Sequence, residues 1–361
     1  SGQRKRILAA RNVHRSMIDA CALLDLDVEF ILDSESDHLC TSHLKPAVLR
    51  ENLERAECLP AGVYVTSPDY LGTIADIAGL AQVCNEYGIP LLVDNAHGAY
   101  LGFLEQSCHP IVQGAALCCD SAHKTLPVLT GGAYLHVAKE FESEYGDLIP
   151  KMLALFGSTS PSYLILQSLD LCNRYLAEGY REKLDIWIDK IDCCKEILRK
   201  RGIPVAETEP LKIVIESWRA GYTGEETAEE LRKYGIECEY ADRQYVVLMV
   251  TPENAESDLN RLEQWSSGSR LLEQKMVSLK LQPVRLGRIE RACSIREAVF
   301  GESEMVPVSQ TLGRICAAET VSCPPAVPVV VSGERITEEM IKLLQEYEIK
   351  EVAVMCLSTG R

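Results

Sequence analysis

The sequence lacks any apolar stretch of the length that spans a membrane, about 18 residues or more. It also lacks an excess of positive charge, since 37 Lys and Arg stand against 53 Asp and Glu and give a formal net charge of −16. Such an acidic chain is a poor partner for nucleic acids and for anionic membrane surfaces, and we expect neither. The basic residues 1–6 lead into a short strand-like segment, so no signal peptide is predicted.

Cysteine is abundant, but the motifs that would give it a metal-binding or disulfide role are missing. The 15 cysteines include adjacent pairs at 118–119 and 193–194 and no Cys-x-x-Cys. We therefore expect no zinc site, and no metal site is predicted. Many cysteines lie inside apolar runs, as small buried residues do, which favours a reducing, cytoplasmic location.

Alternating strand and helix patterns fill the first half of the chain. A strand-like run at 63–66 precedes apolar residues at helical spacing between 74 and 84, and strand-like runs follow at 91–94 and 116–119. This order predicts an α/β fold with a mainly parallel, doubly wound sheet. With 361 residues the chain exceeds one usual domain, and a second, smaller α/β domain is expected after a long helical segment.

Two polar motifs follow neighbouring predicted strands. Residues 93–98 read Val-Asp-Asn-Ala-His-Gly, and residues 121–127 read Ser-Ala-His-Lys-Thr-Leu-Pro. In a parallel sheet this places the carboxylate of Asp94 and the amine of Lys124 at the strand ends where α/β folds bind ligands. A lysine beside a carboxylate that can pair with a pyridinium nitrogen is what pyridoxal phosphate chemistry requires.

With these motifs the chain resembles the bacterial Orn/Lys/Arg decarboxylases, which have the aspartate aminotransferase-like fold called fold type I. Further matching segments lie, in family order, at residues 11–16, 66–70, 158–163, 221–224, 294–298 and 332–337. The resemblance implies a pyridoxal-phosphate-dependent carboxy-lyase that converts lysine, ornithine or arginine to the corresponding amine and CO2. It also implies a homodimer or higher homo-oligomer.

The resemblance assigns roles to residues of both motifs. Lys124 is implied as the lysine that forms a Schiff base with the cofactor, and Asp94 as the partner of its pyridine nitrogen. An Asp after a strand also commonly caps a helix, and the two roles are compatible. Ser121 matches a residue that contacts the cofactor phosphate, and His123 one that contacts the cofactor's surroundings. His97 is expected to line the cofactor ring.

Two more cofactor contacts are implied outside these motifs. His14 matches a histidine that stacks on the cofactor ring. Ser158 matches a loop that reaches the cofactor phosphate of the partner subunit, so the resemblance implies a shared active site.

The resemblance also gives domain boundaries. We expect a cofactor-binding large domain at 1–178, a small α/β domain with a bridging helix at 179–265, and a decarboxylase-type C-terminal domain at 270–361. Residues 266–269, Ser-Ser-Gly-Ser, have the composition of a linker.

The chain also departs from the family. Relatives carry an upstream glycine-plus-hydroxyl loop that binds the cofactor phosphate, and its absence gives the expectation that this chain is N-terminally incomplete. The absence of this loop leaves open the alternative that the protein is a catalytically incompetent relative with a regulatory role. An aminotransferase stays open too, with Arg243 or Arg296 binding the substrate carboxylate. For the distal cation of a basic substrate, Glu239 and Asp242 are weak candidates.

Overall fold

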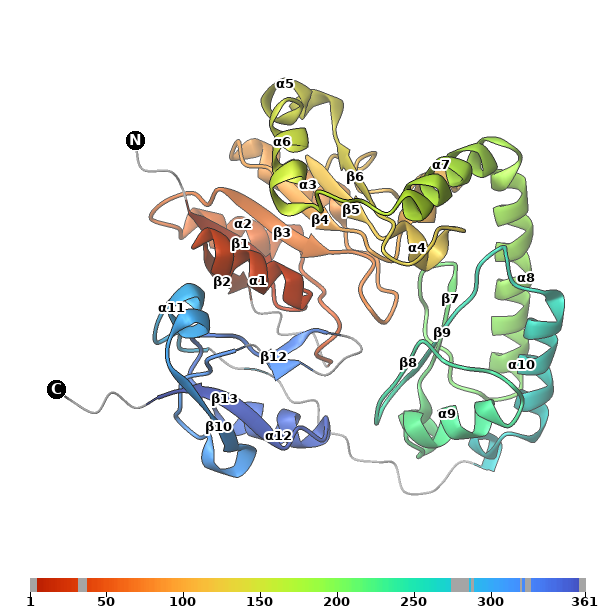
Figure 1. Ribbon diagram of the computed structural model, residues 1–361. Coiled ribbons are helices and arrows are strands. Elements are labelled where there is room, and N and C mark those ends of the chain that lie inside the picture. The colour runs from red at the N-terminus through yellow and green to blue at the C-terminus, as the bar shows by residue number, and fades with distance from the viewer. Residues whose placement is uncertain are drawn as a thin grey trace. The chain divides into compact units, whose positions relative to one another are not determined.

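The computed structural model describes residues 5–31, 38–273, 286, 289–318, 320–321 and 326–356 (Figure 1). By its internal contacts the chain divides into two compact units. Unit 1 comprises Ser1–Thr66, Gln82–Leu91 and Gln282–Arg361, and unit 2 comprises Ser67–Ala81 and Leu92–Leu281. Within the described ranges, every helix is too short or too polar to cross a lipid bilayer.

The main sheet has six strands in the order β2-β1-β3-β4-β5-β6. Unit 1 contributes β1 (Arg6–Ala10), β2 (Asp27–Ile31) and β3 (Gly62–Thr66). β1 is parallel to both of its neighbours, with Ile7 opposite Val28 and Gly62. Four of its five residues are buried, as expected for a strand covered on both faces. Helix α1 (Arg15–Leu24) buries Met17, Ile18 and Cys21 in the same core cluster as β1.

The C-terminal part of unit 1 is a small α/β assembly. Its elements are α11 (Ile295–Phe300), β10 (Ser303–Pro307), β11 (Thr320–Val321), β12 (Pro328–Val330), α12 (Glu338–Glu346) and β13 (Glu351–Met355). β10 pairs with β13, and β11 with β12, both antiparallel. α12 buries Met340 and Leu344 against this core.

Buried polar contacts join the two ends of the sequence inside unit 1. Arg11 donates to the carbonyl oxygens of Pro328 and Val329 at 3.0 and 3.2 Å and lies 3.3 Å from the Glu334 carboxylate. Arg296 donates to the carbonyl oxygens of Ala22 and Leu23, at the end of α1. These contacts explain why residues 282–361 group with the N-terminal strands. The three domain boundaries expected from the sequence stay a prediction.

The other three strands of the main sheet are β4 (Leu91–Asp94), β5 (Leu117–Asp120) and β6 (Tyr134–Val137). They belong to unit 2, except that the first residue of β4, Leu91, is counted with unit 1. β4 and β5 are parallel, whereas β6 runs antiparallel to β5 at the sheet edge. The predicted α/β fold with a mainly parallel sheet is confirmed. The helices and turns that follow these strands are η1 (Ala99–Phe103), α4 (Ala122–Thr125), η2 (Lys139–Phe141), α5 (Glu142–Tyr145), α6 (Leu148–Phe156), α7 (Tyr163–Ala177) and α8 (Tyr180–Lys200).

A second, three-stranded sheet of unit 2 has the order β7-β9-β8, all antiparallel. Its strands are β7 (Lys212–Ile215), β8 (Tyr240–Ala241) and β9 (Val246–Met249), and its helices are α9 (Gly224–Arg232) and α10 (Glu256–Gly268). The remaining elements are α2 (Pro46–Glu54), α3 (Ile77–Glu86), η3 (Ser217–Ala220), η4 (Arg270–Glu273) and η5 (Val308–Gln310). α8 buries Leu184, Trp187 and Ile191 in the core that it shares with this sheet.

The predicted linker at 266–269 is wrong. Ser266 and Gly268 belong to the last turn of α10, and Ser266 and Ser269 are buried. The Ser266 hydroxyl donates to the Glu263 carbonyl at 2.7 Å, and the Ser269 hydroxyl donates to the Glu230 carboxylate at 3.3 Å. A run of small polar residues has the composition of a linker. In this protein the same side chains form hydrogen bonds at the C-terminal end of a helix, which the composition alone does not reveal.

Candidate active site at the ends of β4 and β5

The two predicted motifs meet at one edge of the main sheet. Asp94 is the last residue of β4, and its register partner on β5 is Cys119. Because the strands are parallel, both chains leave the sheet at the same edge. The Asn95 amide donates to the Cys119 carbonyl at 2.9 Å and extends the pairing by one step. After β5 the chain turns into the short helix α4, which carries Lys124.

Lys124 and His97 are in direct contact. The Lys124 Nζ lies 3.0 Å from the His97 Nε2, and the His97 ring is buried. Burial lowers the pKa of the Lys124 amine below its ordinary value. The Asp94 and Glu239 carboxylates act in the opposite direction, and the Lys212 ammonium adds to the lowering. More of the amine is therefore neutral, and able to act as a nucleophile, than in an exposed lysine at the same pH.

The turn after β4 sets the position of His97. The Asp94 Oδ1 accepts a hydrogen bond from the Ala96 amide at 3.1 Å, which bends the chain back beside the strand end. The next residue, Gly98, has no room for a side chain: a Cβ there would overlap the Asn95 Oδ1 and lie 2.7 Å from the Leu101 Cδ1. The motif therefore needs both its aspartate and its glycine for steric and hydrogen-bonding reasons.

Tyr70 extends the contacts from His97 to an acidic side chain. Its ring meets the His97 ring edge-on, with centroids 5.1 Å apart, and its hydroxyl donates to the Glu239 Oε1 at 3.1 Å. It also meets the Tyr240 ring edge-on at 5.4 Å. Tyr70 lies in the matched segment 66–70, but the sequence analysis gave it no role. Its neighbours in the sequence, Asp69 and Leu71, give no indication of these aromatic contacts.

Lys212 was also missed. It begins the apolar strand β7, where a lysine is usually a solvated end residue, yet its side chain is fully buried. Its Nζ donates to the Asp69 carbonyl at 2.9 Å and lies 3.2 Å from the Glu209 carboxylate. Glu209 in turn accepts a hydrogen bond from Tyr100. This buried cation contributes to the lowered pKa of Lys124.

The other predicted site residues have local partners. His123 is half-buried, and its Nδ1 donates to the Gly132 carbonyl at 3.0 Å. Ser121 is the N-cap position of α4, without a capping bond from its hydroxyl. Ser158 is exposed, and its Oγ accepts from the Ser160 amide at 3.1 Å. His14 caps α1 by accepting from the Ser16 amide at 3.2 Å, and it belongs to unit 1.

The candidates for binding the substrate differ in whether their charged groups are already engaged within the protein. Asp242 is buried and holds its own turn, accepting from the amides of Gln244 and Tyr245 and from the Tyr240 hydroxyl. Glu239 is exposed and contacts Tyr70. Arg296, as described above, is engaged with carbonyl groups of unit 1.

Comparison with known proteins places the site in context. Two family models match the chain: "Orn/Lys/Arg decarboxylase, major domain" over residues 2–218, and "Orn/Lys/Arg decarboxylase, C-terminal domain" over residues 274–351. The chain is 28% identical to an arginine decarboxylase of Bacillus subtilis, covering 95% of this chain and 73% of that protein. It is 30% identical to the uncharacterised protein YaaO of the same organism, covering 94% and 72%.

Solved structures agree on the fold. A lysine decarboxylase of Francisella novicida, LdcF, superposes with a TM-score of 0.76 at 15% identity, covering 99% of this chain and 67% of that chain. The constitutive lysine decarboxylase of E. coli superposes with a TM-score of 0.74 at 15% identity, covering 99% and 68%.

Proposed function

Because the chain belongs to the Orn/Lys/Arg decarboxylase family, we propose that it decarboxylates lysine, ornithine or arginine with the help of pyridoxal phosphate. The observation that carries the proposal is the contact between Lys124 and His97 at the strand ends, with Asp94 one turn away. The family model of the major domain covers all three of these residues. The family match and this arrangement favour the same chemistry.

The residues present fit the cofactor. Lys124 supplies a half-buried amine of lowered pKa that would bind the aldehyde carbon of the cofactor, and Asp94 supplies a carboxylate that would keep the ring nitrogen protonated. When bound, pyridoxal phosphate accepts the electron pair that is left when CO2 departs. The His97 Nε2, 3.0 Å from the Lys124 Nζ, can take a proton from that amine or return one. Ser121, His123, His14 and Ser158 remain proposed contacts of the cofactor.

For the distal cation of the substrate we favour Glu239 over Asp242. The Asp242 carboxylate already accepts three hydrogen bonds from its own turn. Glu239 is exposed, and its negative charge acts to raise the pKa of the Lys124 amine. A carboxylate there would attract an ammonium or guanidinium group, while Tyr70 restrains its orientation through the hydroxyl hydrogen bond.

Decarboxylation is favoured over transamination and over a purely regulatory role. Of the two arginines that could bind the substrate carboxylate in an aminotransferase, Arg296 is engaged with backbone carbonyls of unit 1 and Arg243 is exposed in the turn between β8 and β9. A regulatory relative would have no need to keep a half-buried lysine in contact with a buried histidine.

The test is a product assay on the purified protein supplied with pyridoxal phosphate. One of lysine, ornithine and arginine is expected to give CO2 and its amine in equal amounts. Glu239→Gln should raise KM for that substrate about 10- to 100-fold, the value of one charge-assisted hydrogen bond, with a smaller change in kcat. Glu237→Gln, an exposed residue paired with Arg232, is the matched control. A 2-oxo acid formed without CO2 would contradict the proposal.

We further propose a homodimer, because one surface of unit 2 is unusually apolar. α6 has no buried residue, and its Leu155 and Phe156 are 69% and 59% exposed. Tyr163 and Leu164 at the start of α7 are 84% and 69% exposed. We call these residues and Leu153 the α6–α7 surface. Large apolar side chains exposed on two consecutive helices are typical of a protein–protein interface, and Ser158 lies in the segment between the two helices.

Charge placed on the α6–α7 surface is expected to separate the subunits. Leu155→Asp should convert a dimer into a monomer in light scattering, because an unpaired carboxylate in an apolar interface is costly. Ile186→Asp, on an exposed position of α8, is the control and should stay dimeric. A wild-type monomer, or a Leu155→Asp dimer, would refute this assignment of the interface.

A further inference from the structure

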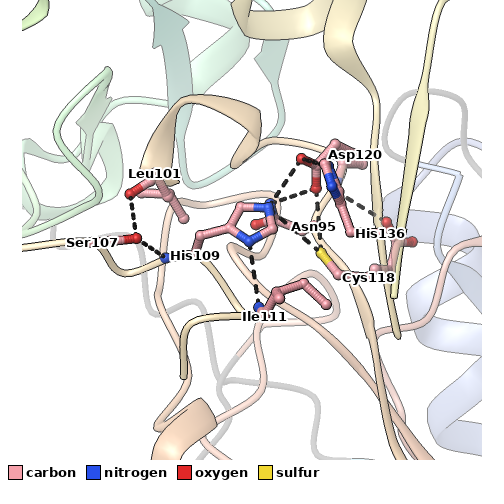
Figure 2. A network of polar contacts seen from close by, with 10 residues as sticks. Asn95, Leu101, Ser107, His109, Ile111, Cys118, Asp120 and His136 are labelled. Carbon is pink, nitrogen blue, oxygen red and sulfur yellow. Dashed lines mark hydrogen bonds and ion pairs between the residues drawn. The ribbon is translucent and has the colours of Figure 1, made fainter. Parts of the chain in front are cut away.

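Behind the strand ends, four side chains of metal-ligating types converge (Figure 2). The Asp120 Oδ2 lies 3.1 Å from the His109 Nε2 and 3.0 Å from the His136 Nε2. The Cys118 Sγ lies 3.3 Å from the Asp120 Oδ1 and 3.9 Å from the His109 Nε2. One ligand atom from each of His109, Asp120 and His136 can be chosen so that all three atoms lie within 4.8 Å of one another.

The sheet itself brings three of these residues together. Cys118 and Asp120 are two residues apart on β5, so their side chains leave the same face of the strand. His136 on β6 is the register partner of Cys118, which places it on that face as well. His109 comes from the segment between η1 and β5, where a hydrogen bond from its own amide to the Ser107 hydroxyl supports the turn.

The distances and donor types suit a divalent transition metal. Ligands bonded at about 2.0–2.3 Å to a tetrahedral ion lie about 3.3–3.8 Å from one another. The Asp120 Oδ2 lies 3.1 and 3.0 Å from the two imidazole nitrogens, close to that range. Imidazole nitrogens with a carboxylate and a thiol are ligands that zinc accepts, whereas calcium and magnesium prefer all-oxygen sites.

We propose that His109, Asp120 and His136 bind a zinc-type divalent metal ion, with the Cys118 thiol beside them. The site is distinct from the Lys124 pair. Its ligands do not follow a Cys-x-x-Cys spacing, which is why the sequence analysis predicts no metal here. This cluster instead draws one residue from a loop and three from paired strands.

Neighbouring side chains hold the proposed metal ligands in place. The Asn95 Nδ2 donates to the Asp120 Oδ1 at 2.7 Å, which orients the carboxylate as the outer contacts of metal ligands do. Asp120 and His109 are buried, whereas the His136 side chain is 40% exposed and leaves a path for the ion. Although burial raises the pKa of Asp120, hydrogen bonds from His109 and His136 outweigh it and hold that pKa below its ordinary value.

The experiment is a Zn2+ titration of the reduced, chelator-stripped protein against a chromophoric chelator. One tight equivalent per chain is expected. His136→Gln should weaken it by about 10- to 100-fold or more, and because that side chain is 40% exposed the variant should still fold. Asp120→Asn should weaken it as well. His43→Gln, in unit 1, controls for histidine number, and Cys193→Ser, exposed on α8, controls for adventitious thiol binding.

Co2+ gives a readout of the ligands themselves. The wild-type protein should show the visible bands of Co2+ bound at low coordination number, and His136→Gln should lose them, whereas Cys193→Ser should keep them. Zn2+ should raise the melting temperature of the wild type and not that of His136→Gln. The proposed metal site would be overturned if the wild-type protein did not bind Zn2+ tightly, or if His136→Gln and Asp120→Asn bound it as tightly as the wild type. Either result would mean that the cluster is a hydrogen-bond network.

Discussion

Lys124→Ala is expected to abolish covalent capture of pyridoxal phosphate. The wild-type protein, incubated with the cofactor and reduced with borohydride, should carry the label on Lys124. It should also show visible absorbance before reduction. The physical reason is the lowered pKa of the half-buried Lys124 amine beside His97, which makes it a better nucleophile at neutral pH than an exposed lysine.

The pH dependence of capture follows from the same pKa. Only the neutral amine reacts, so the rate should rise with pH and level off below the pKa of an ordinary lysine, about 10.4. Lys190→Ala, at a surface ion pair with Glu256, is the control and should keep full labelling. Peptide mapping that finds the label on another lysine, or an unchanged yield in Lys124→Ala, would remove Lys124 from the proposed mechanism.

Asp94→Asn is expected to slow decarboxylation by about 10²- to 10³-fold, the usual cost of removing one preorganised electrostatic partner. The asparagine side chain can still accept the hydrogen bond from the Ala96 amide, so the turn to His97 should persist. The loss should therefore appear in kcat, with thermal stability close to that of the wild type. Asp185→Asn, at an exposed position of α8, is the matched control. Wild-type turnover in Asp94→Asn would contradict the role of this carboxylate.

Local chemistry made much of the fold predictable. A capping box at residues 223–226 begins α9, with the Thr223 hydroxyl accepting from the Glu226 amide at 3.1 Å and the Glu226 carboxylate accepting in return. The long helical segment is divided at Gly179, which α7 and α8 flank and whose φ of +78° suits glycine. Both features depend on residues within one turn of each other, which a sequence displays directly.

The candidate site was predictable only where its residues follow strands. Asp94 and Lys124 meet because their strands are adjacent and parallel, and strand order could be inferred from the alternating pattern. Lys212 could not be found, because its partners Asp69 and Glu209 come from separate turns. The cluster around Asp120 escaped for a similar reason, since it depends on the register of β5 with β6. Register and side-chain pairing between distant segments leave no local pattern.

The tight turn at Gly98 has a consequence for protein engineering. Because a Cβ at this position would meet the Asn95 side chain, and Asn95 is held in turn by Asp120, residues 94–98 form one inflexible piece. Attempts to change substrate preference by varying the loop around His97 would therefore disturb the sheet behind it. Glu239, which is exposed and hydrogen-bonded to Tyr70, is the better position at which to begin such a redesign.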